Sequence, residues 1–129
     1  MQMGKLCQVN AIVNESMLAS TNGGGDVRVL GTPAMIALME QAAVQCMDGL
    51  VGEGETTVGT QMDVIHIAAV PTGGQITATA EVIQQSGRKV MFKVFCEDRN
   101  GLIGKGTHMR IVVNRDQFQQ NAQKKLVRA

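Results

Sequence analysis

Only one segment of the chain has the pattern of a long helix, and nearly everything after it has the pattern of strands. Residues 32–49, TPAMIALMEQAAVQCMDG, are apolar at most positions. Thr32 suits an N-cap, Pro33 suits the first turn, and Gly49 suits the position just past the end. The helix is predicted to run for about four turns. Any sheet formed by the rest of the chain must use this helix as its cover.

The strands are predicted from alternation of apolar and polar residues with a period of two. They are expected over residues 56–70, 75–83, 89–97 and 103–113, with a weaker first strand over 4–13. The connections PTGG, QSGR and RNGL are turn sequences, and the Asn-Gly pair in the last is the strongest short hairpin signal. The polar tail after the last strand is predicted to form a short helix.

The order strand, helix and four strands predicts one α+β domain over residues 1–129, with an antiparallel sheet wrapped around one central helix. One helix cannot cover both faces of a sheet or seal its edges. We therefore expect a homodimer in which two sheets join edge to edge. A higher homo-oligomer is the alternative.

Composition narrows the classes of partner. The net charge is +1 and the 129 residues include three Phe but no Trp or Tyr, so neither a basic face nor a stacking platform for nucleic acid is expected. No apolar run is long enough to cross a bilayer, so no membrane partner is expected. The chain has an odd number of cysteines, and none has CxxC spacing: Cys7, Cys46 and Cys96. They indicate free thiols in a reducing, cytoplasmic setting. The two histidines lie far apart, so neither a metal nor another cofactor is predicted.

Residues 14–26, NESMLASTNGGGD, combine three consecutive glycines with Ser, Thr and Asn. Such a composition predicts a flexible loop. It is either an ordinary surface loop or a mobile flap beside a functional site.

Glu40 is out of place in the apolar helix. At 100° per residue its neighbours on the same face are all apolar, whereas Gln41, Gln45 and Asp48 form a polar stripe about a quarter-turn away. Glu40 is therefore predicted to lie at or near the buried face. An unpaired buried carboxylate is costly, so such a residue is either paired or functional.

His66 violates the pattern of its strand in the same way. The alternation places it on an apolar face, with these residues on one side of the strand: Val58, Met62, Val64, His66 and Ala68. A lone histidine there is usually a satisfied core residue. Two titratable side chains on elements that must pack together are a stronger signal, and Glu40 and His66 are possible partners in acid–base chemistry.

Thr32 is a third candidate, because its hydroxyl would lie at a helix N-terminus, where free N–H groups and the helix dipole favour developing negative charge. It precedes Glu40 by about 12 Å along the axis. A thioester could lie between them.

The residues 28–120 resemble the hotdog-fold thioesterases of the fluoroacetyl-CoA thioesterase-like family. The resemblance rests on a threonine, a glutamate eight residues later, VGT followed by a histidine, and finally GKGTHMR. It implies a hotdog fold, a homodimer and hydrolysis of an acyl-CoA substrate. The family's catalytic Thr, Glu and His correspond to Thr32, Glu40 and His66, and its residues around the thioester or CoA correspond to Gly59 and Arg110.

The segment before Thr32 departs from the fluoroacetyl-specific enzyme, which has an aromatic lid contact there. LASTNGGGDVRVLG contains no Phe, so the sequence does not predict which acyl group the substrate carries. The leading hypothesis is an acyl-CoA thioesterase for a small acyl group, in which Glu40 is base or nucleophile, His66 is the acid–base group and Thr32 polarises or attacks the carbonyl. Covalent and direct water attack are both compatible with these residues.

Two other functions fit the same fold: a non-catalytic acyl-CoA binding module, and an enoyl-CoA hydratase or dehydratase. Arg88 and Lys89 are more simply solvated charges than CoA ligands, and His108 is expected to be an ordinary strand residue with a local hydrogen bond.

Overall fold

The computed structural model describes residues 3–127. In chain order the elements are β1 (Leu6–Ile12), the 3₁₀ helix η1 (Glu15–Met17), α1 (Ala19–Asn22), α2 (Thr32–Met47), β2 (Glu55–His66), β3 (Gln75–Ser86), β4 (Lys89–Asp98), β5 (Gly101–Asn114) and α3 (Arg115–Val127).

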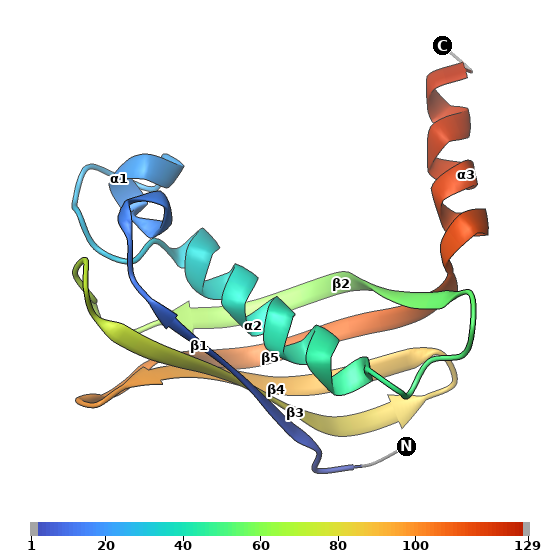
Figure 1. The fold of residues 1–129 in the computed structure, drawn as a ribbon, viewed down its shortest axis with the longest axis horizontal. Helices are drawn as coiled ribbons and strands as arrows, with labels where there is room; N and C mark the ends of the chain where they lie inside the picture. Colours follow the sequence, from blue (N-terminus) through green and yellow to red (C-terminus); the bar gives the residue numbers. More distant parts are fainter. Residues whose placement is uncertain (1–2, 128–129) are drawn as a thin grey trace.

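The five strands form one antiparallel sheet in the order β1-β3-β4-β5-β2, so β1 and β2 are its edges. Figure 1 shows α2 lying along one face of this sheet. The short helix α1 lies at one end of the sheet, and α3 projects from the other end. The predicted α+β arrangement of a sheet curved around one long helix is confirmed.

The core lies between α2 and the inward face of the sheet. The alternation predicted for β3 and β4 is confirmed, because the inward residues of both strands are buried: Ile76, Ala78, Ala80, Val82, Val90, Phe92, Val94 and Cys96. From α2 they meet Met35, Leu38, Met39, Ala42, Ala43, Cys46 and Met47. Met side chains thus supply much of the volume that aromatics fill in other cores.

The prediction for β2 is wrong in two places. A bulge between Gly59 and Gln61 adds one residue to the strand, and an extra residue reverses the alternation on either side of it. Val58 therefore faces away from Met62, Val64 and His66. The strand also ends at His66, because the next two amides both donate to the carbonyl of Ile103 and the ladder stops there.

The start of α2 also differs from the prediction by one residue. Gly31, not Thr32, is the N-cap, with extended φ −78° and ψ 148°, and no side chain caps the helix. Thr32 is instead the first helical residue, which leaves its hydroxyl free for another partner. At the other end Asp48 is the C-cap, and Gly49 follows it with φ +76°, as expected for a glycine just past a helix.

The region predicted as a flexible loop contains the two short helices η1 and α1. Asn14 caps η1 by accepting a hydrogen bond from the amide of Ser16. An ion pair between Arg28 and Glu15 ties the glycine-rich segment back to η1. The segment therefore has local order on both sides of its glycines.

The polar tail forms the predicted helix, α3, which has no buried residue and contacts β5. Within residues 3–127 no helix is long and apolar enough to span a membrane.

Candidate active site

Thr32 and His66 are in direct contact. Oγ1 of Thr32 lies 2.8 Å from Nδ1 of His66, so the first residue of α2 meets the last residue of β2. The other ring nitrogen of His66, Nε2, is buried and has no hydrogen-bond partner among the described residues. A buried polar atom without a partner is unusual in a folded protein and is typical of a site that binds something.

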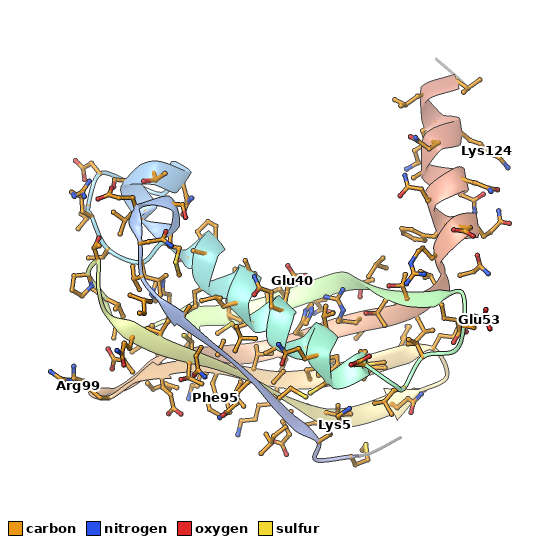
Figure 2. All side chains as sticks on the ribbon, in the orientation of Figure 1. Lys5, Glu40, Glu53, Phe95, Arg99 and Lys124 are labelled. Atoms are coloured by element: carbon orange, nitrogen blue, oxygen red, sulfur yellow. The ribbon has the colours of Figure 1, made fainter. Side chains whose placement is uncertain are left out.

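Glu40 lies two turns further along α2, on the side that faces β2 (Figure 2). Its side chain is 43% exposed, so it is half-buried and not fully buried. Its helical neighbours explain this: Ala43 and Met47 are buried, but Ala37 and Val44 are exposed. Glu40 therefore sits at the border between the core face and an uncovered apolar strip of α2.

The suggested pairing of Glu40 with His66 does not occur. Oε2 of Glu40 accepts a hydrogen bond from Nη1 of Arg110 at 3.4 Å, whereas His66 contacts Thr32. The candidate site thus has two polar centres, one at the start of α2 and one in its middle.

Arg110 is the buried residue of the second centre, and only 6% of its surface is exposed. Its Nε donates to Oγ1 of Thr57 at 2.9 Å and its Nη2 donates to the carbonyl of Thr57 at 3.2 Å. Burial lowers the pKa of Arg110, and the neighbouring Glu40 carboxylate opposes that shift. With these fixed contacts on β2, the guanidinium presents Nη1 to Glu40.

Gly59 makes room for Glu40. A Cβ built at Gly59 would lie 2.6 Å from Oε2 of Glu40 and 3.1 Å from Cε1 of His108. Real Cβ contacts do not approach so closely, so any larger residue would displace the carboxylate. The structure thereby places Gly59 and Arg110 next to each other, both beside the same Glu40 oxygen.

Sequence reasoning missed His108. Its side chain is 1% exposed, its ring stacks on Phe92, and its Nε2 lies 3.1 Å from Nη1 of Arg110. The available signal was its spacing, because residues 108 and 110 of one strand must share a face. Burial lowers the pKa of His108, which favours the neutral imidazole.

A cavity of about 410 Å³ opens beside Thr32 and His66. Its wall combines the glycine-rich segment with residues after β2, and most of its side chains are small or apolar, including Val27, Val29, Leu30, Ala68 and Ala69. No Phe, Tyr or Trp side chain lines it, and its only rings are the imidazole of His66 and the pyrrolidine of Pro33.

The other charges considered above have local roles. Arg88 pairs with Glu55 at 3.2 Å and donates to the carbonyl of Val112 at 3.1 Å, so it ties β2 and β5 to the β3–β4 turn. Lys89 is exposed at the start of β4. Across the described part of the chain, no three His, Cys, Asp or Glu side chains are grouped so as to hold a metal ion.

Comparison with known proteins assigns this arrangement to a class. A model of the family described as fluoroacetyl-CoA-specific thioesterase, FlK, matches residues 13–116. A fluoroacetyl-CoA thioesterase from Streptantibioticus cattleyicolor is 37% identical over 97 residues, which is 75% of this chain and 70% of that protein.

Solved structures of similar proteins support the same assignment. A structure of the fluoroacetyl-CoA thioesterase FlK has a TM-score of 0.91 at 30% identity and covers 97% of both chains. A thioesterase superfamily member from Thermus thermophilus has the same TM-score at 22% identity, covering 98% of this chain and 94% of its own, and shows the shared fold. The fold and these relatives thus define a thioester hydrolase of the hotdog class. The chain belongs to the fluoroacetyl-CoA-specific thioesterase family.

Proposed function

We propose that the protein hydrolyses a small acyl-CoA thioester to the free acid and CoA, using Thr32, His66 and Glu40. Membership of the family makes it an acyl-CoA thioester hydrolase. The observation that carries the residue assignment is the placement of two polar centres on one rigid helix, with the Thr32–His66 contact at its start and Glu40 two turns on.

The first centre is suited to the thioester carbonyl. As the carbonyl carbon is attacked, its oxygen becomes negative, and the Thr32 hydroxyl together with free N–H groups in the first turn of α2 can stabilise that charge. His66, in contact with Thr32, is placed to move a proton between the attacking group and the leaving thiolate. The C–S bond breaks, the sulfur receives the proton, and the acid is released.

The second centre supplies the carboxylate. Glu40 is half-exposed and is held at one oxygen by Arg110, so its other oxygen is open to the solvent side. It acts either as a base that removes a proton from water or as a nucleophile that forms an acyl-enzyme anhydride. Heavy oxygen found in the Glu40 carboxylate after a single turnover in heavy-oxygen water would demonstrate the anhydride route, because direct attack by water leaves the Glu40 oxygens unlabelled.

The cavity beside Thr32 and His66 supports a small acyl group. It is lined by short apolar side chains, without the aromatic contact expected of a fluoroacetyl-selective lid. An apolar wall of this kind separates acyl groups by size, with only about 1–3 kcal/mol for each methylene.

The test is hydrolysis of an acyl-CoA panel by wild type, Glu40→Gln and His66→Ala, followed by the loss of thioester absorbance. We expect wild type to turn over the short acyl-CoAs and both variants to lose most of that turnover. Unchanged turnover in both variants would reject the site. Tight binding of the esters by wild type without hydrolysis would instead favour a binding module.

The same proposal includes a homodimer in the cytoplasm, with residues 1–129 as one domain. Support for the dimer comes from the edge position of β2 in the sheet and from exposed apolar side chains: Ile65 on β2 at 56%, Ile67 just after it at 53%, and Val44 on α2 at 48%. The three free cysteines support a reducing compartment. Light scattering after size exclusion measures the mass of the assembly.

A further inference from the structure

A buried polar network lies behind Glu40, and of its members only Arg110 has a part in the chemistry above. It joins His108 and Arg110 on β5 to Gln61 and Thr57 on β2, on both sides of the β2 bulge. A completely buried histidine in contact with a buried arginine is costly unless each nitrogen has a suitable partner.

The contacts of His108 fix its protonation. Its Nδ1 lies 2.8 Å from the carbonyl oxygen of Gln61, which can only accept, so Nδ1 carries the hydrogen. Its Nε2 lies 3.1 Å from Nη1 of Arg110, which can only donate, so Nε2 must be the acceptor. His108 is therefore a neutral imidazole with its proton on Nδ1, and its 4.0 Å approach to Oε2 of Glu40 is not an ion pair.

This arrangement restrains Arg110. Thr57 holds Nε and Nη2, and His108 accepts from Nη1, which also donates to Glu40 at the longer distance of 3.4 Å. Without the imidazole acceptor, the guanidinium would be free to swing toward the carboxylate and bind both of its oxygens, the geometry that arginine prefers.

We propose that His108 is a positioning residue that acts through Arg110, so that Glu40 is held at Oε2 alone and keeps Oε1 free for the reaction. This inference rests on the proposed function of Glu40. Oε1 makes no hydrogen bond within residues 3–127, and Gly59 leaves the space in which Oε2 is held.

Three variants separate positioning from packing. His108→Phe keeps a ring against Phe92 but removes both hydrogen bonds. His108→Gln restores an acceptor near the place of Nε2. Phe92→Leu disturbs the packing around His108 and leaves its hydrogen bonds in place, so it is the matched control.

The kinetic test compares kcat and KM for the best acyl-CoA, per mole of folded enzyme. We expect His108→Phe to lower kcat by about tenfold to a hundredfold with little change in KM, because Glu40 is misplaced. His108→Gln should recover most of the loss, and Phe92→Leu should lower the melting temperature with kcat retained. Equal kcat in wild type and His108→Phe overturns the proposal.

Two measurements do not depend on activity. Nitrogen NMR of wild type should show His108 protonated at Nδ1 and bare at Nε2 near neutral pH, and the opposite tautomer or an imidazolium overturns the proposal. A crystal structure of His108→Phe should show the Arg110 guanidinium moved against Glu40, and an unmoved guanidinium also overturns it. If wild type hydrolyses no acyl-CoA, the proposed function fails, and these two measurements still decide whether His108 restrains Arg110.

Discussion

Oγ1 of Thr32 lies 2.8 Å from Nδ1 of His66, and this contact closes the start of α2 onto the end of β2. Both residues come from element ends, where the backbone ladder stops and side chains are free to make other contacts. The sequence suggested the Thr32 hydroxyl as both a helix cap and a catalytic group; in the structure it contacts the His66 imidazole and does not cap the helix.

Replacing Thr32 by Val removes the hydroxyl and keeps the shape of the side chain. We expect the loss of this hydrogen bond to cost about 1 kcal/mol of unfolding free energy and to lower kcat strongly, while Thr32→Ser retains much of the activity. Urea unfolding and steady-state hydrolysis measure the two effects. A Thr32→Val enzyme with the wild-type kcat would show that the hydroxyl has no part in the reaction.

Gly59→Ala tests whether Glu40 needs the space beside it. The added Cβ would lie 2.6 Å from Oε2, so the half-exposed carboxylate must move outward. We expect at least about tenfold lower kcat, because the carboxylate is displaced. We also expect a lower melting temperature, because the Cβ would lie 3.1 Å from Cε1 of the buried His108. Gly52→Ala is the matched control, since its Cβ also meets a carboxylate, that of Glu55 at 3.2 Å, far from the site. Equal losses in both variants would contradict the prediction.

Arg110→Lys should impair both stability and turnover. A lysine ammonium cannot span Thr57, His108 and Glu40 at once, as the planar guanidinium does. With buried acceptors left unpaired, we expect a loss of about 2 kcal/mol or more in chemical unfolding. Arg115→Lys, at the exposed start of α3, is the control and should leave the unfolding free energy unchanged.

The buried His108 predicts a pH dependence of stability. Its pKa is lowered in the folded protein from an ordinary value of 6.5, mainly by burial, so the unfolded chain binds the proton more readily. The stabilising contribution is complete above that ordinary pKa and declines as the pH falls below it. Urea unfolding at several pH values should therefore show that the unfolding free energy of wild type falls as the pH is lowered. The fall should be smaller for His108→Gln. Parallel curves for the two proteins would count against the buried neutral imidazole.

The cysteines should differ in reactivity. Burial raises the pKa of Cys46 to about 12 and that of Cys96 to about 11, so neither forms appreciable thiolate near neutral pH. Iodoacetamide followed by mass spectrometry should find both unmodified in the native protein, with Cys7, which is only half-buried, labelled first. In urea all three should react. Labelling of Cys46 without denaturant would contradict this.

Much of the fold was predictable because most of the strands alternate without interruption. Ile76 to Val82 and Val90 to Cys96 are buried at every second position, so the sequence pattern alone orients both strands. The bulge at Thr60 was not predictable in this way, because it depends on how β2 pairs with β5 and not on the residues of β2 themselves.

The candidate site was predictable as a set of residues more than as a set of contacts. Glu40 and His66 were found because each breaks an apolar pattern, but a pattern does not say which other side chain each one meets. His108 breaks no apolar pattern, and its spacing from Arg110 indicates only that the two side chains share a face. Its hydrogen bonds with Gln61 and Arg110 are known only from the structure.

The regular turns of α2 between Thr32 and Glu40 also make the site intolerant of changes in chain length. A single residue inserted between them would rotate Glu40 by about 100° about the helix axis and lengthen the interval by about 1.5 Å. The Glu40 carboxylate would then leave the space beside Gly59, even though every residue type was preserved. Insertions and deletions in related sequences should therefore be absent from this interval and collect in the glycine-rich segment before it, where the same change leaves both centres in register.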